Sequence, residues 1–485
     1  MSLYKNLFKQ TAIYGLATVV PRIFSFLLTP LYTDILPEDK YGEMSLVFAW
    51  MAFFNVVLAY GMETAFFRFY NSDNKQTVLN TSTVSVFWSS LLFLLSALLF
   101  RNFLAKVSGI DVEYITYTIW ILVLDALVII PFSKLRAQGR PMFYSMIKIG
   151  NVGVNLLLNV FLLIYLPKLA LSYPDSFWGT IFVKNFEIGY IFISNVIASL
   201  LTLIVLLPHY FKMNWHFDME LWKRMMRYSI PVLIAGMAFV VNETFDRIFL
   251  EKLLPANIAK AEVGIYSGCY KLAVFMTLFA TAFRLGIEPF FFSHSKNESA
   301  PQTYATITKY FVIFGSIILL GVVVFSDLLK ELMIRRESYW EGMKVVPLVI
   351  LANFFLGIYH NLSVWYKLSD KTKIGAYISI VGAIVTIVLN VTLIPIWSYM
   401  GSAIATLAAY SSMMIISYYF GNKYYPIPYD TKKIGGYLLL SIILSMGYFY
   451  GFRQNYYVGV AAILVYAVFI YRNEKQVLLR ILRRK

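Results

Sequence analysis

Residues 229–250 read SIPVLIAGMAFVVNETFDRIFL, a run whose length suits a helix across a lipid bilayer, which takes about 20 residues. The second half of this run nevertheless carries Asn242, Glu243, Asp246 and Arg247. Glu243 stands four residues before Arg247, which is the favourable order for an ion pair along a helix. Because charges in membrane spans usually face a protein interior or a water-filled cavity, we expect these four residues to form a polar wall at such a site.

The rest of the chain has the composition of a membrane protein. Its 485 residues are 59% hydrophobic, 18% aromatic and 14% charged, whereas an average soluble domain is about 25% charged. Apolar runs recur from end to end and predict an all-α polytopic membrane protein with 14 transmembrane helices. The predicted spans are 11–33, 44–66, 81–100, 114–133, 144–166, 187–207, 229–250, 263–288, 306–326, 345–366, 375–396, 401–420, 434–451 and 457–471.

The basic residues are unevenly divided between the loops. The net charge is +16, and the loops on one side, such as 134–140, 367–373 and the C-terminal tail, hold about twice as many Lys and Arg as those on the other. The positive-inside rule therefore predicts that both termini are cytoplasmic. The first apolar run continues past Arg22 without a cleavage site, so we expect a span there rather than a signal peptide. The charge is explained without nucleic acid as a partner.

Two pairs of segments indicate an internal repeat. LYTDILPEDKYGEMSL at 31–46 resembles FLEKLLPANIAKAEVGIYSG at 249–268, and the ends of spans 5 and 11 share a Leu-Asn-Val motif. A six-span unit repeated with the same polarity predicts two pseudo-symmetric six-helix lobes around a central cavity, plus two extra C-terminal helices. The predicted boundaries are an N-terminal lobe at 1–210, a cytoplasmic interfacial linker helix at 211–228, a C-terminal lobe at 229–422, and spans 13–14 with a basic tail at 423–485.

Span 1 carries an arginine near the middle of its length. Arg22 lies on a polar helical stripe with Gly15, Thr18, Ser25 and Thr29. Neither Thr18 nor Phe26, one helical turn away on either side, is an acid. The partner of Arg22 is therefore water, another helix or a ligand, and a buried pair with Glu63 or Asp125 is the structural alternative.

Spans 5 and 8 carry further basic residues. Lys148 begins a stripe that continues with Asn151, Asn155 and Asn159, and it lies close enough to the cytoplasmic end to snorkel. Lys271 has Ser267 and Phe275 at the positions where an acid in the same helix would neutralise it. Arg284 is spaced to pair with Glu288.

Cations that face an internal cavity predict an anionic substrate, most simply one that bears phosphate. The candidate substrate-binding residues of this cationic lumen are Arg22, Lys271, Arg247, Arg284 and Lys148. Candidate coupling carboxylates for H⁺ or Na⁺ are Glu63, Asp125, Glu243 and Asp246, for which ion pairing is an equal explanation.

Signatures of an enzyme are missing from the sequence. The four histidines, His209, His216, His294 and His360, have no metal-ligand spacing, and there is no phosphate-binding glycine loop or G-x-S-x-G motif. The predicted loops leave no room for a catalytic domain outside the membrane. We therefore expect a transporter with no catalytic residue, no metal and no cofactor, and regard a membrane glycosyltransferase or polymerase as the lesser alternative.

Several segments together resemble a known superfamily. They are TAIYGLATVVPRIFSFLLTPLYTDIL at 11–36, LRAQGRP at 135–141, EVGIYSGCYKLAVF at 262–275 followed by EPFFF at 288–292, and PIWSYMGSAIATLAAY at 395–410. In their order along the whole chain they resemble the polysaccharide-transporter branch of the multidrug/oligosaccharidyl-lipid/polysaccharide exporter superfamily. The resemblance implies a 14-span fold that works by alternating access.

The resemblance also implies a function. It suggests a flippase in the bacterial inner membrane that moves undecaprenyl-pyrophosphate-linked oligosaccharide to the outer leaflet for O-antigen, capsule or exopolysaccharide assembly. Arg22 and Lys271 are the positions that best fit the cations expected to engage the pyrophosphate. Membrane lipid and polymer-assembly proteins are the other implied partners.

Two relatives in the same superfamily remain as alternatives. A multidrug antiporter would bind an organic cation and couple its export through an intramembrane acid, a role that Glu63 or Asp125 could fill. Arg22 in the body of span 1 instead favours an anion. A flippase for the lipid-linked peptidoglycan precursor would share both the fold and a cationic cavity.

Overall fold

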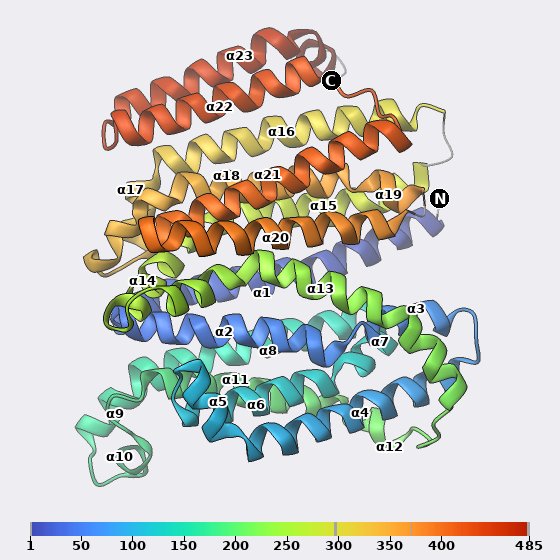
Figure 1. Cartoon of the computed structure of the whole chain (residues 1–485), viewed down its shortest axis with the longest axis vertical. Helices are drawn as coiled ribbons and strands as arrows, with labels where there is room; N and C mark the ends of the chain where they lie inside the picture. Colours follow the sequence, from blue (N-terminus) through green and yellow to red (C-terminus); the bar gives the residue numbers. More distant parts are fainter. Residues whose placement is uncertain (1, 295–297, 370, 483–485) are drawn as a thin grey trace. The chain divides into compact units, whose positions relative to one another are not determined.

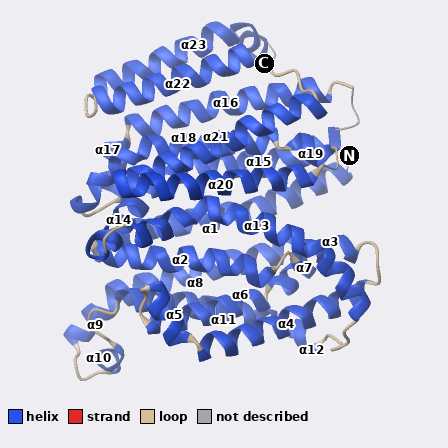
Figure 2. Cartoon of the chain, viewed as in Figure 1, coloured by secondary structure: helices blue, strands red, loops and turns tan. Residues whose placement is uncertain are grey.

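The computed structural model of the protein describes residues 2–294, 298–369 and 371–482. Within these ranges every regular element is a helix and no strand occurs (Figure 2). In the same part of the chain, 14 helical segments are long and apolar enough to cross a membrane, and each overlaps one of the predicted spans. The prediction of an all-α polytopic protein with 14 spans is therefore confirmed.

The chain divides into two compact units, residues 1–264 and residues 265–485, so that the boundary falls inside helix α14 (Ala256–Tyr270). Each unit is described by itself below. The lobe and linker boundaries expected from the sequence repeat stay a prediction.

The described part of the first unit contains the helices α1 to α13 and the first turns of α14 (Figure 1). They are α1 (Ser2–Ile35), α2 (Glu38–Ala59), α3 (Met62–Tyr70), α4 (Lys75–Leu99), α5 (Arg101–Ser108), α6 (Val112–Leu127), α7 (Ile129–Ala137), α8 (Pro141–Val160), α9 (Leu166–Ser172), α10 (Phe177–Ile181), α11 (Glu187–Leu206), α12 (Pro208–Phe211) and α13 (Met219–Leu253). A π-helical turn, Phe161–Tyr165, joins α8 to α9.

Helix α8 packs on α1 and on α11, α11 also packs on α6, and α2 packs on both α6 and α13. An apolar core forms where α3, α4, α7 and α13 meet, and Phe66, Leu79, Ile130 and Met225 are buried there. These contacts place apolar side chains between the helices, and close packing of such side chains is a main source of helix association within a membrane.

Helix α13 runs without a break from the segment expected as a linker into span 7. Asp218 caps its N-terminus, where the carboxylate accepts a hydrogen bond from the backbone N–H of Leu221 at 2.9 Å. Leu221 and Met225 are buried, and the indole of Trp222 donates to Ser85 Oγ of α4 at 2.9 Å. The first turns of α13 are thus packed against the first unit.

Two glycines let α2 and α14 cross with their backbones in contact. A Cβ atom on Gly42 would overlap the carbonyl oxygen of Lys260, and one on Gly264 would overlap that of Glu38. Lys260 lies one helical turn before Gly264, and Glu38 lies one turn before Gly42, so the two contacts are reciprocal. Beside this crossing, Lys260 Nζ pairs with Glu43 Oε1 at 3.1 Å.

The second unit holds the end of α14 and the elements that follow it. These elements are the 3₁₀ turn η2 (Lys271–Ala273), α15 (Val274–His294), α16 (Ala300–Val324), α17 (Ser326–Met333), the 3₁₀ helix η3 (Glu337–Val345), α18 (Val346–Leu362), α19 (Val364–Leu368), α20 (Thr372–Trp397), α21 (Tyr399–Tyr424), α22 (Thr431–Gly451) and α23 (Tyr456–Leu482).

The last two spans, α22 and α23, form a hairpin that packs on α16. Lys309 Nζ of α16 pairs with Glu474 Oε2 of α23 at 2.7 Å, and Tyr437 of α22 donates to Glu474 Oε1 at 3.0 Å. Glu474 is buried, where an unpaired charge would be costly, and the ammonium of Lys309 balances its charge. These three residues join the two extra helices to the rest of the second unit.

Candidate functional site

Several spans are broken close to the polar residues selected from the sequence. Span 2 breaks between α2 and α3, where Tyr60 and Gly61 have φ angles of 33° and 72°. Glycine suits this conformation, and a Cβ on Gly61 would lie 2.6 Å from the carbonyl oxygen of Ser229. The break places Glu63 in the first turn of α3.

Spans 4 and 8 are also interrupted. Span 4 breaks at Val128, just after Asp125, and span 8 passes through the 3₁₀ turn η2, which begins at Lys271. Irregular backbone inside a membrane is tolerated where protein or water satisfies its polar groups, and it often marks a binding site. The helix breaks therefore support Glu63, Asp125 and Lys271 as functional candidates.

Glu63 forms an ion pair in the first unit. Its Oε1 lies 2.6 Å from Arg136 Nη1 of α7, and both side chains are nearly half exposed, at 46% and 42%. The guanidinium of Arg136 also lies over the ring of Phe67, 4.8 Å from its centroid. Glu63 thus joins α3 to α7.

Asp125 and Lys148 share one polar neighbourhood in the first unit. Ser199 Oγ of α11 donates to Asp125 Oδ1 at 2.8 Å. Lys148 Nζ lies 4.4 Å from the centroid of the Phe132 ring and within electrostatic range of Asp125. The opposite charges of the two side chains would partly offset the cost of burying them.

The asparagine stripe of span 5 is hydrogen-bonded to neighbouring helices. Asn159 Oδ1 accepts from the hydroxyl of Tyr32 in α1 at 2.9 Å, and Asn159 Nδ2 donates to Asn155 Oδ1 at 2.6 Å. Asn151 Nδ2 donates to Thr202 Oγ1 of α11 at 2.9 Å. The stripe therefore links α8 to both α1 and α11.

Arg22 lies on α1 of the first unit and is exposed there, whereas Thr29 on the same stripe is buried. Lipid would not solvate an exposed guanidinium within a candidate span, so this side chain suits a position that faces protein, water or a ligand.

The polar wall of span 7 is built around one ion pair. Arg247 Nη1 lies 2.9 Å from Asp246 Oδ1, with the two side chains 15% and 2% exposed. Arg247 Nη1 also donates to the backbone oxygen of Glu243 at 3.2 Å. Asn242 is buried and Glu243 is exposed. Asp246 is thus a carboxylate that pairs with Arg247, and the pairing of Glu243 with Arg247 that spacing predicts stays a prediction.

Lys271 lies in the second unit and is half-buried, at the point where α14 gives way to a 3₁₀ turn. The turn packs against α17 and α18, and Asn353 of α18 donates to the hydroxyl of the preceding Tyr270 at 3.3 Å. Lys271 is therefore held on an irregular segment that packs on helices of its own unit.

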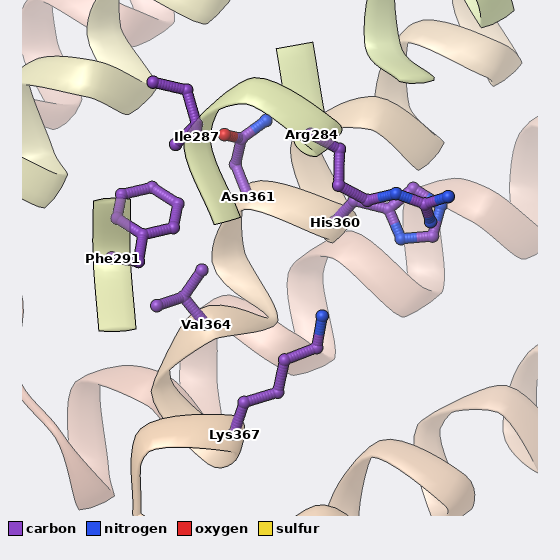
Figure 3. Close-up of a pocket in the computed structure, with 7 residues that line it drawn as sticks. All are labelled: Arg284, Ile287, Phe291, His360, Asn361, Val364 and Lys367. Atoms are coloured by element: carbon purple, nitrogen blue, oxygen red, sulfur yellow. The ribbon is translucent and has the colours of Figure 1, made fainter. Parts of the chain in front are cut away.

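Arg284 borders a hollow in the second unit that Figure 3 shows in close-up. One face comes from α15, with Arg284, Ile287 and Phe291, and the other from α18 and α19, with His360, Asn361, Val364 and Lys367. We call this the α15–α19 hollow. Its enclosed space is about 10 Å³, room for about one water molecule. The side chain of Glu288, the predicted partner of Arg284, lies outside the residues whose side chains are described.

His360 and Lys367 are absent from the candidates drawn from the sequence. His360 lacks metal-ligand spacing, and Lys367 reads as one of many basic loop residues. Helical spacing is the sequence signal that could have pointed to them. Positions 360, 364 and 367 are spaced to share one helical face, and positions 284, 287 and 291 are spaced to share another. In the part of the chain that the structure describes, no cluster of His, Cys, Asp and Glu could hold a metal ion.

These features define a class: an all-helical, polytopic membrane protein whose broken spans carry charged side chains. The sequence profile of a family described as polysaccharide biosynthesis protein matches residues 7–284, more than half of the chain. A second profile, MatE, matches residues 231–392. The chain belongs to the polysaccharide biosynthesis protein family, within the multidrug/oligosaccharidyl-lipid/polysaccharide exporter superfamily. This confirms the predicted superfamily and the expectation of a transport protein rather than an enzyme.

Solved structures show the same fold. The chain superposes on the lipid II flippase MurJ in an inward closed conformation with a TM-score of 0.73 and 15% identity, covering 95% of this chain and 99% of that one. For the MATE multidrug transporter DinF-BH, the TM-score is 0.63 and the identity 15%, covering 89% and 96% of the two chains.

A relative by sequence is an uncharacterized membrane protein, MJ1375, of Methanocaldococcus jannaschii. It is 23% identical over 195 residues, which are 39% of this chain and 44% of the relative. The chain thus matches less than half of the length of this curated relative.

Proposed function

We propose that the protein is a flippase that moves a polyprenyl-pyrophosphate-linked oligosaccharide from the cytoplasmic to the outer leaflet by alternating access. The observation that carries this proposal is the match of residues 7–284 to the polysaccharide biosynthesis family. The sequence resemblance narrows the lipid to undecaprenyl pyrophosphate and the setting to the bacterial inner membrane, with both termini cytoplasmic. O-antigen, capsule and exopolysaccharide assembly are the pathways it would serve.

The distribution of charge supports an anionic substrate. Arg22 is exposed within a candidate span, Lys271 lies on a broken span, and Lys148 and Arg284 add positive charge in the two units. In the proposed cycle, cations of this candidate set bind the pyrophosphate while the polyprenyl tail stays in lipid, and Arg247 belongs to the same set. Each negative charge that moves outward across an inside-negative membrane gains about 2.3 kcal/mol per 100 mV, so the substrate helps to drive its own export.

The coupling ion, where one is used, would act at a carboxylate. Asp125 is the strongest of the four candidates, because it lies near Lys148 and beside a break in span 4. Glu63 and Asp246 already pair with arginines, and Glu243 is exposed on the same helix as Asp246. Exchange of H⁺ or Na⁺ at Asp125 and contacts with polymer-assembly proteins belong to this proposal.

The test is a comparison of substrates in liposomes that contain the purified protein. We expect transfer between leaflets of a polyprenyl-pyrophosphate oligosaccharide and little transfer of the lipid-linked peptidoglycan precursor. Preferential transfer of the precursor would assign the second flippase function, which the MurJ-like fold accommodates. Sodium- or proton-dependent movement of an organic cation, without lipid transfer, would overturn the proposal in favour of an antiporter.

A matched pair of arginine variants tests the role of the cations. Arg22→Ala should reduce lipid transfer by roughly tenfold or more, since a charge-assisted hydrogen bond contributes about 1.5–3 kcal/mol. Arg101→Ala is the control, because Arg101 is an exposed residue at the start of α5 outside the candidate spans. Equal transfer by the two variants, at equal protein levels, would remove Arg22 from the site.

A further inference from the structure

We propose that the α15–α19 hollow binds a phosphoryl group through Arg284, His360 and Lys367. The inference rests on the proposed function and deepens it, since it joins one cation predicted from the sequence, Arg284, with His360 and Lys367 in an anion site built entirely from the second unit. The connections that follow α15 and α19 lie on the predicted cytoplasmic side. The hollow would therefore receive the phosphoryl group of a substrate before translocation.

The polar lining of the hollow has the chemistry of an anion site. Arg284 offers a planar fork of N–H donors, Lys367 a compact positive charge, and His360 a ring N–H donor. The described lining includes no carboxylate. In Figure 3, the side chains of Arg284 and Lys367 come from different helices, and the guanidinium of Arg284 overlaps the ring of His360 in this view. Two or more basic groups from separate helices suit a phosphoryl group, which has several acceptor oxygens.

Neighbouring hydrogen bonds support the helix junction that carries these side chains. Asn361 Nδ2 donates to the backbone oxygen of Gly357 at 3.0 Å, which fixes the orientation of its amide. At the junction of α18 and α19, Ser363 Oγ donates to the backbone oxygen of His360 at 2.6 Å. The turn at Ser363 between α18 and α19 is therefore stabilised by a side-chain hydrogen bond. His360 precedes this turn and Lys367 follows it.

The other half of the hollow is apolar. Ile287, Phe291 and Val364 line it, and Phe291 and Val364 belong to a buried core with Tyr304 and Ile427. Tyr304 donates to the backbone oxygen of Phe291 at 2.8 Å. An apolar wall beside the cations lowers the local dielectric and strengthens their attraction for an anion. It also suits a phosphoryl group attached to a hydrocarbon chain.

Binding requires a small movement of long side chains. The enclosed space of about 10 Å³ is smaller than a phosphoryl group. Arg284 and Lys367 have several rotatable bonds, so their tips can separate while α15, α18 and α19 stay packed. The wall formed by Phe291 and Val364 is buried and stays in place.

The test measures binding of inorganic pyrophosphate and of geranyl pyrophosphate to the full-length purified protein by isothermal titration calorimetry. We expect saturable binding that Lys367→Gln weakens by roughly tenfold or more, with His360→Gln also weaker and Lys367→Arg close to wild type. Tighter binding of geranyl pyrophosphate than of pyrophosphate assigns the site to a lipid headgroup, and equal affinities assign it to a free anion.

Lys373→Gln is the matched control, because Lys373 is an exposed residue near the start of α20, close to Lys367 in sequence, and does not line the hollow. Equal binding by Lys367→Gln and Lys373→Gln, or no binding by wild type, would overturn the inference and leave the cations as partners of the helix C-termini. His360→Gln decides the matter if Lys367→Gln does not fold. A wild-type protein that binds pyrophosphate but moves no lipid would contradict only the proposed function.

Discussion

At the scale of single residues, the region between spans 9 and 10 contains a charge cluster that lies outside the candidate membrane segments. Asp327 is buried and accepts hydrogen bonds from Arg453 Nε and Nη2 at 2.9 and 2.8 Å. Lys330 Nζ lies 2.8 Å from the same carboxylate and 4.3 Å from the centroid of the Trp340 ring. Three separate segments of the second unit therefore meet at this cluster.

This cluster makes stability depend on pH. Burial raises the pKa of Asp327, but hydrogen bonds from Arg453 and Lys330 outweigh it and hold the pKa below its usual value of 3.8. A depressed pKa gives stability that is present above pH 3.8 and is lost as the pH falls through the folded-state pKa. Thermal unfolding in detergent should therefore show a lower midpoint in this acid range.

Asp327→Asn is the comparison for the pH measurement. At neutral pH it should cost roughly 1–3 kcal/mol, because two basic groups lose their charged acceptor. Its unfolding midpoint should then fall less than that of wild type on acidification. A wild type and variant with parallel acid curves would show that the cluster does not carry the pH dependence.

The sequence selects candidate residues, but it does not identify the partners of their side chains. Helical spacing predicts Glu243 as an acid for Arg247, and the structure shows an ion pair with the adjacent Asp246, which spacing did not indicate. Spacing compares Cβ positions, whereas a long arginine side chain can fold back along its own helix. The sequence did not indicate His360 and Lys367 for a related reason. They line the hollow only because α15 packs on α18 and α19, and the sequence of one helix does not show which helix packs against it.

At the scale of helices, the crossing of α2 and α14 makes a sharp prediction. Gly42→Ala or Gly264→Ala places a methyl group against a backbone carbonyl, which cannot move without shifting its helix. We expect each variant to be destabilised by roughly 1–3 kcal/mol, the usual cost of overpacking. The midpoint of thermal unfolding in detergent measures the effect.

Gly150→Ala is the control for this crossing. It lies inside α8, and a Cβ there would meet nothing within 4 Å. Alanine favours a helix over glycine by about 1 kcal/mol, so this variant should be as stable as wild type or more so. If Gly42→Ala were equally well tolerated, close backbone contact between α2 and α14 would not be needed for the fold.

The sequence predicted where spans lie but not how they are built. Hydropathy averages over a whole run, so the breaks at Gly61, Val128 and Lys271 leave no trace in it. Helix α13 shows the converse. Pro231 lacks an N–H and often ends a helix, yet α13 continues through it, with its first turns held by the Asp218 cap and by buried Leu221 and Met225.

At the scale of the whole molecule, fourteen spans and superfamily membership followed from the sequence, because long apolar runs and the order of whole segments are both global signals. The choice of substrate depends instead on a few charged side chains, and these have no strict motif. The proposed mechanism therefore rests most heavily on one claim: cations in the spans bind an anionic lipid headgroup, and the membrane potential favours its outward movement.

The most direct measurement of this claim is the rate at which a polyprenyl-pyrophosphate oligosaccharide changes leaflets in proteoliposomes under an imposed potential. The variants are Lys271→Ala, Lys271→Arg and, as the control, Lys106→Ala, which changes an exposed residue of α5 outside the candidate spans. We predict wild-type transfer that rises with an inside-negative potential, loss in Lys271→Ala, and substantial transfer in the other two. Transfer by Lys271→Ala at the wild-type rate, insensitive to potential, would contradict the proposed mechanism.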